Sequence, residues 1–268
     1  MNDTVFGAAT LNPESAVLPV GRLVGAYWAE TRFEFRRIRR TPALFLPLLL
    51  LPAALYLLFA VAIAGKAIAA DPAVGVFLFV GFAVLAVTMP ALFPICTSLA
   101  VDRESGVMRL RRVQPAPAGA WLVAKTASSL AFSVLAYLPV LAAALATGKL
   151  TLGFGQLLAM SAALISGAIP FGALGLMLGT LVSGSAAPGY ANLIYLPGCY
   201  LSGLFFPLPA SMHWQVPLWP QFHVNQLAMY AAGIEKFQFV PLQLTIAALT
   251  GYTVLFGAIA IWRLAYRP

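Results

Sequence analysis

Long apolar runs alternate with short polar segments along the chain. Six of the runs exceed about 20 residues, the length at which an α-helix rising ~1.5 Å per residue crosses a hydrocarbon core of roughly 30 Å. None of these runs contains Asp, Glu, Lys, Arg or His. The third uncharged run begins at Thr126, directly after Lys125, although the predicted span begins four residues earlier. The pattern predicts six membrane spans, at residues 43–64, 73–100, 122–147, 156–182, 186–206 and 240–261.

Residues 20–41, ahead of the first span, have an amphipathic pattern. Hydrophobic residues recur at spacings of three and four, which aligns them on one face of a helix, while most of the basic residues lie elsewhere and Phe33 breaks the pattern. We expect a helix in the cytoplasmic membrane interface, held by lipid headgroups or equally used to dock a cytoplasmic partner. The predicted anchoring residues are Trp28, Arg36, Arg37, Arg39 and Arg40.

Two connecting segments also have helical patterns. Residues 102–113 combine apolar and charged residues and predict a short cytosolic helix that can dock reversibly on a soluble protein; the alternative is a solvated basic loop. Residues 207–239 predict an external segment with an interfacial helix at Gln221–Ala232. Residues 1–19 predict a flexible N-terminus.

Two local motifs predict how helices begin and pack. Asp71-Pro72 combines a capping side chain with a proline suited to the first helical position, so a helix should begin there. Gly175 and Gly179 form a small-xxx-small surface, which lets two helices approach closely. We expect this surface to pack within the chain rather than between two copies.

Composition supports an all-α integral membrane protein with one domain over residues 1–268. Hydrophobic residues make up 61% of the chain and charged residues 9%, and the mean hydropathy is +0.90, far above the globular average. Such a chain has too few polar residues for a disordered segment or a nucleic-acid-binding module. The cysteines, Cys96 and Cys199, lie inside apolar runs, which excludes a secreted disulfide scaffold.

The distribution of basic residues explains the net charge of +8 without a polyanionic partner such as nucleic acid. Basic residues concentrate before the first span, between the second and third spans and after the last, whereas the opposite loops hold only Lys66, Lys149 and Lys236. Because basic residues in short loops stay on the cytoplasmic side, both termini are predicted to be cytoplasmic. The expected location is a prokaryotic-type inner membrane, reached without a cleavable signal peptide.

The residue pattern predicts neither catalysis nor metal binding. The chain lacks a Gly-x-x-x-x-Gly-Lys-Ser/Thr loop, the sequence that cradles the phosphates of ATP. His213 and His223 have no acidic residue or cysteine nearby that could complete a zinc site. We therefore predict no catalytic residue, no metal ligand and no cofactor bound by this chain.

The arrangement as a whole resembles the membrane-spanning permease subunits of type-2 ABC exporters. One motif that carries the resemblance is an acidic-x-Gly sequence followed by basic and apolar residues and then proline, from Glu104-Ser105-Gly106 to Pro115. The other is Ser202-Gly203-Leu204-Phe205-Phe206-Pro207, which ends the fifth span and leads into the external segment. Together with the six spans and the amphipathic helix, the resemblance covers nearly the whole chain.

The resemblance implies a division of labour between subunits. A separate cytosolic ABC ATPase, expected in two copies, binds ATP and Mg²⁺, while a second permease, identical or paralogous, completes the substrate path in the lipid bilayer. Segment 102–113 then corresponds to the coupling helix that contacts the ATPase. The implied coupling residues are Asp102, Arg103, Glu104, Gly106, Arg109, Leu110, Arg111 and Arg112.

The substrate class follows from what the apolar runs lack. Ion and proton pathways need ionisable groups at membrane depth, so their absence favours an apolar or amphipathic substrate such as a lipid, a lipid-linked molecule or a drug. The alternatives are a polysaccharide exporter and a non-transporting assembly or sensor subunit. The substrate path is predicted at Phe77, Phe82, Tyr195, Tyr200, Phe205 and Phe206.

Overall fold

The computed structural model describes residues 20–40, 42–112, 117, 119–206 and 208–266, and every regular element in these ranges is a helix. The prediction of an all-α membrane protein is therefore confirmed, whereas the predicted flexible N-terminus at residues 1–19 lies outside the described residues. The described elements are α1 (Val20–Arg39), α2 (Pro42–Leu57), η2 (Leu58–Ile63), α3 (Gly65–Ala70), α4 (Pro72–Glu104), α5 (Val107–Arg112), α6 (Ala120–Ala146), α7 (Phe154–Ser166), α8 (Ala168–Leu181), α9 (Ala187–Leu201), η3 (Ala210–Leu218), α10 (Pro220–Ala232), η4 (Glu235–Phe237) and α11 (Leu242–Tyr266).

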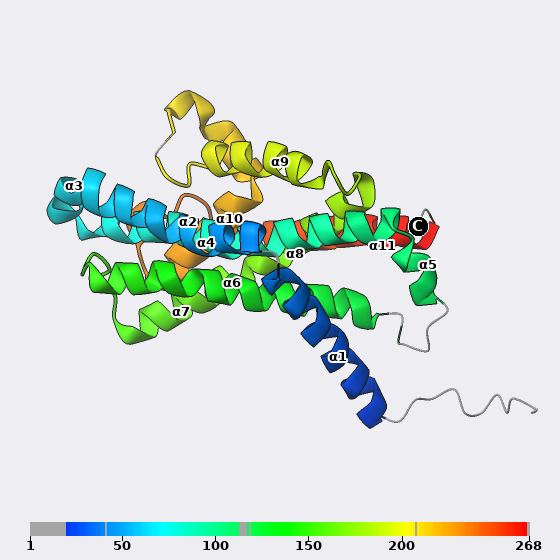
Figure 1. Ribbon diagram of the computed structural model, residues 1–268. Coiled ribbons are helices and arrows are strands. Elements are labelled where there is room, and N and C mark those ends of the chain that lie inside the picture. Colours follow the sequence, from blue (N-terminus) through cyan, green and yellow to red (C-terminus); the bar gives the residue numbers. More distant parts are fainter. Residues whose placement is uncertain (1–19, 41, 113–116, 118, 207, 267–268) are drawn as a thin grey trace, which may run out of the picture.

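Helix α4 is the centre of an elongated bundle (Figure 1). It is buried along most of its length and packs against α2, α6 and α8. It begins as predicted, because the Asp71 carboxylate accepts a hydrogen bond from the Ala73 amide at 2.9 Å and Pro72 occupies the first turn. The bundle has two ends: α3 marks one, and α5 and the C-terminus of α11 lie at the other.

The small-xxx-small surface of α8 packs against α4, as predicted. A Cβ atom on Gly175 would lie 2.6 Å from the carbonyl oxygen of Leu92, and one on Gly179 would lie 2.8 Å from that of Cys96. Side chains larger than hydrogen would therefore push the two backbones apart. The glycine pair is a contact within the chain.

The membrane spans differ in detail from the sequence prediction. Five helical segments of the described part are long and apolar enough to cross a membrane, namely Leu46–Ile63, Pro72–Glu104, Ala120–Ala146, Phe154–Leu181 and Leu242–Tyr266. The first of these ends in the π-helical turns of η2, and the fourth is interrupted at Gly167 between α7 and α8. The helix in the predicted fifth span is α9, which has 15 residues and rises only about 22 Å.

Helix α9 is shorter than predicted because the chain turns sharply after it. Gly203 has a φ of 68°, in the left-handed region where glycine carries no Cβ penalty. The predicted span 186–206 therefore contains a helix only over Ala187–Leu201. Helix α9 runs alongside the bundle (Figure 1) but is too short to be counted among the five candidate spans. Whether the chain crosses the membrane six times therefore stays a prediction.

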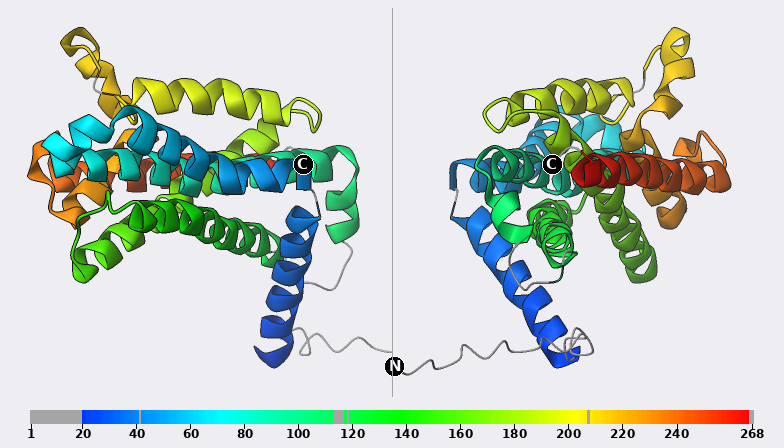
Figure 2. Two further views of the ribbon diagram at one scale, coloured as in Figure 1. Left: turned by 60° about the vertical axis from the view of Figure 1, so that its left-hand side comes forward. Right: turned by 90° about the vertical axis from the view of Figure 1, so that its right-hand side faces the viewer.

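Helix α1 crosses the end of the bundle rather than running along it (Figure 2). It packs on α6, where the rings of Phe35 and Phe132 stack with centroids 4.6 Å apart. The Ser128 hydroxyl of α6 also donates to the Thr31 carbonyl at 3.1 Å. This orientation is the one expected for a helix in the membrane interface.

Helix α10, the short helix predicted at Gln221–Ala232, spans Pro220–Ala232 and is packed inside the α3 end of the bundle. Several of its polar side chains are buried and bond to backbone groups of neighbouring segments. Gln156 of α7 donates to the last carbonyl of α10, Ala232, at 3.0 Å. The predicted external segment after α9 is therefore packed against the bundle through α10.

Candidate functional site

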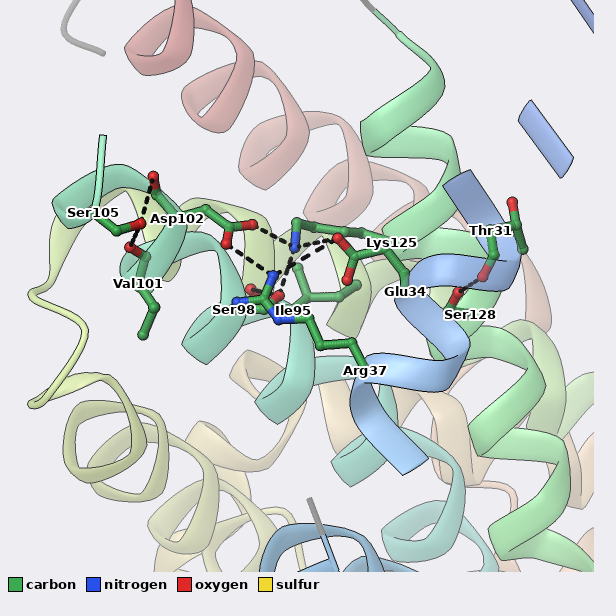
Figure 3. Close-up of polar contacts among 10 residues, drawn as sticks. All are labelled: Thr31, Glu34, Arg37, Ile95, Ser98, Val101, Asp102, Ser105, Lys125 and Ser128. Carbon is green, nitrogen blue, oxygen red and sulfur yellow. Dashed lines mark hydrogen bonds and ion pairs between the residues drawn. The ribbon is translucent and has the colours of Figure 1, made fainter. Parts of the chain in front are cut away.

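Four charged side chains meet where α1, α4 and α6 come together at the α5 end (Figure 3). Glu34 and Arg37 come from α1, Asp102 from the last turn of α4, and Lys125 from the first turns of α6. Lys125 Nζ lies 3.1 Å from Glu34 Oε1 and 3.0 Å from Asp102 Oδ2. Arg37 Nη1 donates to Asp102 Oδ1 at 2.8 Å. We call these four residues the junction cluster.

The junction cluster is largely shielded from solvent. The side chains of Glu34 and Lys125 are 1% exposed and that of Asp102 is 4% exposed, whereas Arg37 is 34% exposed. Two carboxylates face two cations, and Lys125 also donates to Ser98 Oγ at 2.8 Å. A buried charge without its partner is strongly destabilising, so these groups hold three helices in one arrangement.

The local sequence places Glu34 inside the apolar stripe of α1. It lies one turn before Ile38, which is buried, and three residues after Thr31, which contacts α6. Residues three and four apart share a helix face. The carboxylate is therefore carried toward α6 by the hydrophobic contacts on either side of it.

The corner between α4 and α5 follows directly after Asp102. The Ser105 amide bonds to the Val101 carbonyl at 2.9 Å and closes the last turn of α4. Gly106 then adopts a φ of 74°, which lets α5 leave in a new direction. The position of α5 is thus set through a short, glycine-containing corner next to the junction cluster.

The predicted coupling residues are found in different surroundings. Asp102 is inside the junction cluster and Arg103 donates to the Gly179 carbonyl of α8 at 3.1 Å, so both bind within the chain. Glu104 is exposed, and Leu110 on α5 has 63% of its surface exposed. The side chains of Arg109, Arg111 and Arg112 lie outside the described residues, although the backbone of all three belongs to α5.

The structure places two charged residues near this corner differently from the sequence prediction. Asp102 was expected on a docking surface but is buried beside Lys125, which lies within α6 and inside the predicted span 122–147. Arg37 was expected to anchor lipid headgroups, yet its guanidinium binds Asp102. Glu34 was missed altogether, although an acidic residue within an apolar helical stripe is itself a signal of a buried partner.

The other predicted interfacial anchors are at the surface of α1. Arg36, Arg39 and Arg40 are exposed, and Trp28 has 68% of its surface exposed. These side chains are free of the packing that holds Arg37. Their exposure is compatible with contact to lipid headgroups.

The predicted path aromatics do not share one surface. Phe82 stacks on Phe205 with centroids 5.0 Å apart, and Tyr195 is fully buried with its hydroxyl 2.7 Å from Thr88 Oγ1. Tyr200 and Phe206 are instead 63% and 49% exposed. Phe77 lies further along α4, where its ring lies 4.7 Å from that of Phe237.

Both histidines bond to backbone carbonyls at the α3 end. His213 Nε2 lies 2.9 Å from the Leu208 carbonyl, and His223 Nε2 lies 2.8 Å from that of Pro217. Burial lowers the pKa of His223 from its ordinary value, an effect that the bond to Pro217 opposes. Neither histidine belongs to a group of three or more metal-ligating side chains within the described residues.

The apolar helices and the cross-lying α1 define a multi-pass helical membrane protein. A family model described as ABC-2 type transporter matches residues 25–239, most of the chain. The chain belongs to this family and is therefore a permease of an ABC-2 type transporter. No curated protein matches it in sequence.

Proposed function

We propose that this permease is an export subunit that moves a hydrophobic or amphipathic molecule out of the cytoplasmic membrane, driven by a separate cytosolic ATPase. In this proposal the ATPase binds at α5, and the α5 end of the bundle faces the cytoplasm. ATP and Mg²⁺ bind only to the ATPase, which is present in two copies.

The junction cluster carries this proposal. Its ion pairs connect Asp102, at the end of α4 and just before the corner that leads to α5, to both α1 and α6. A force applied to α5 therefore acts on three helices together rather than on one loop. Leu110 is exposed, and the sequence of α5 also contains Arg109, Arg111 and Arg112, so the segment has the apolar and charged residues of a docking helix.

The substrate class is supported by the central part of the bundle. The ring of Phe82 contacts the rings of both Phe59 and Phe205, while the described charged residues concentrate at the bundle ends. Such an interior offers no counterion for a charged cargo. An apolar or amphipathic molecule fits this environment best.

A second permease copy is part of the proposal, as in the family. The outer surfaces of α2 and α9 expose large apolar side chains within the described residues, which include Leu50 on α2 and Leu193 and Tyr200 on α9. These faces can contact lipid or a second permease. We assign them to the pairing of two permeases.

The test is co-purification of the permease from its native membrane, with the bound ATPase identified by mass spectrometry and its recovery compared between variants of exposed residues. Leu110→Asp and Glu104→Lys should each reduce ATPase recovery by about tenfold, the effect of losing roughly 1.4 kcal/mol at an interface. Glu235→Lys is the matched control, because it makes the same charge change at an exposed glutamate of the opposite end. It should leave recovery unchanged.

Equal recovery of the ATPase with all three variants would show that α5 is not the docking site. Isolation of the permease alone from several mild detergents would instead favour an assembly or sensor subunit. Transport of a polysaccharide rather than of lipids or drugs by the reconstituted complex would overturn the substrate assignment.

A further inference from the structure

A partly open cavity of about 420 Å³ lies at the α3 end, lined by residues of α10, η3, η4 and the segment that follows it, the turn after α9 and the start of α4. It is separate from the junction cluster, which lies at the α5 end. Its walls are mostly apolar and include rings of Phe77, Phe222, Phe237 and Phe239. The volume falls within the range of pockets that hold small molecules.

Two neighbouring amides of α10 line this cavity but differ in their bonding. Gln226 is satisfied, because its Nε2 donates to the Phe237 carbonyl at 3.0 Å and its Oε1 accepts from the Phe239 amide at 2.7 Å. Asn225 is 4% exposed, and its Nδ2 has no hydrogen-bond partner among the described residues. Buried polar groups are nearly always paired, so the Asn225 amide is available to donate a hydrogen bond to a ligand in the cavity.

The lining also restricts the charge of a ligand. Among the described residues that line the cavity, none is Asp, Glu, Lys or Arg. A charged group placed there would lose its hydration without gaining a counterion. His213 is at the exposed side of the lining, with Nε2 held by the Leu208 carbonyl. The cavity therefore suits a neutral polar head.

From this geometry we infer that the cavity is a binding site for one neutral amphipathic molecule. The apolar chain lies against the phenylalanine rings, and an ester, carbonyl or hydroxyl oxygen of the head accepts a hydrogen bond from Asn225. Two sources share this chemistry, namely a lipid retained from the bilayer and a molecule on its way through the transporter. The inference concerns the permease itself and does not depend on ATPase docking at α5.

The probe is a medium-chain monoacylglycerol with a diazirine on its acyl chain, applied to the full-length permease in nanodiscs. Light-induced crosslinks, mapped by mass spectrometry, should fall beside the phenylalanine rings, in α10 and at residues 237–239, and be removed by excess unlabelled monoacylglycerol. Asn225→Leu should reduce crosslinking about fivefold, the size expected for one lost hydrogen bond. The fatty acid of the same chain length, ionised at pH 8, should crosslink about tenfold less than the neutral probe.

A second pair of variants tests the cavity by volume. Val216→Trp fills it from η3 and should abolish crosslinking, whereas Leu218→Trp, at an exposed neighbour outside the lining, should leave crosslinking unchanged. Asn225→Leu should not lower the thermal midpoint, because it replaces an unpaired amide by an apolar side chain of similar size. A loss of crosslinking without a loss of stability thus reports binding.

Crosslinking that is unaffected by Asn225→Leu and Val216→Trp, or crosslinks that map elsewhere, would overturn the inference. A lower thermal midpoint of Asn225→Leu would also overturn it, since the amide would then have a structural role. The two sources are separated by adding the ATPase and ATP. A transported molecule is released in an ATP-dependent way, while a bilayer lipid stays bound, and either result keeps the site.

Discussion

At the scale of single residues, Lys125 matters because it touches both buried carboxylates of the junction cluster. Its Nζ lies within 3.1 Å of Glu34 and Asp102, and its side chain is 1% exposed. Removing this cation leaves Glu34 and Asp102 with Arg37 as their one remaining partner in the junction cluster, 3.9 Å from Glu34 and 2.8 Å from Asp102. The cost of such a change comes mainly from the buried negative charge that is no longer balanced.

We predict that Lys125→Met lowers the free energy of unfolding by about 3–5 kcal/mol. Arg37→Met should cost less, because Arg37 is 34% exposed and water can screen the remaining charge. The free energies can be measured by denaturation in mixed micelles. The triple variant Glu34→Gln, Lys125→Met, Asp102→Asn should recover part of the loss. If Lys125→Met alone were neutral, the cluster would not hold the helices together.

His223 gives a second residue-scale prediction, on pH. Its folded-state pKa is lowered by burial, so below the unfolded-state value of 6.5 the unfolded chain binds a proton that the folded chain does not. Stability present above pH 6.5 is therefore lost as the pH falls toward the folded pKa. The thermal midpoint should drop as the pH falls below about 6.5.

The His223→Gln variant should lose most of this acid-induced drop, because glutamine has no charge change in that range. His213→Gln, at the exposed histidine of the same end, is the control and should keep the drop. An identical pH dependence in wild type and His223→Gln would assign the effect to another group.

At the scale of helices, the packing of α8 on α4 depends on glycine. Gly175→Ala places a Cβ 2.6 Å from a backbone oxygen of α4, so the helices must move apart. We predict a loss of about 1–3 kcal/mol, typical of overpacking. Gly251→Ala in α11 has no atom within 4 Å of the new Cβ and should be neutral or slightly stabilising. Thermal unfolding of both variants compares the sites, and equal midpoints would contradict the close contact.

The corner from α4 through Gly106 to α5 shows how one element depends on its neighbours. The short helix α5 could be predicted from the sequence, because its pattern of basic and apolar residues is local. Its attachment to α1 and α6 could not, because Lys125 and Glu34 are 91 residues apart. Only packing brings such distant residues together.

At the scale of the whole molecule, the number of crossings decides where the C-terminus lies. Single cysteines can replace Arg32, Lys66 or Tyr266, which are exposed, while the native Cys96 and Cys199 are buried and should react little. With six crossings, positions 32 and 266 should react with a membrane-impermeant maleimide only from the cytoplasm and position 66 only from outside. Labelling of position 266 from outside would mean that α9 does not cross.

Local patterns in the sequence were sufficient for the all-α membrane class, the amphipathic α1, the start of α4 at Asp71 and the glycine surface of α8, because hydropathy, helical periodicity and capping act between near neighbours. The tertiary structure alone decided the rest: the burial of Asp102 and Lys125, the early end of α9, and the cavity beside Asn225. These features arise where segments far apart in the chain pack together, and burial then determines which charges must pair and which amides stay unpaired.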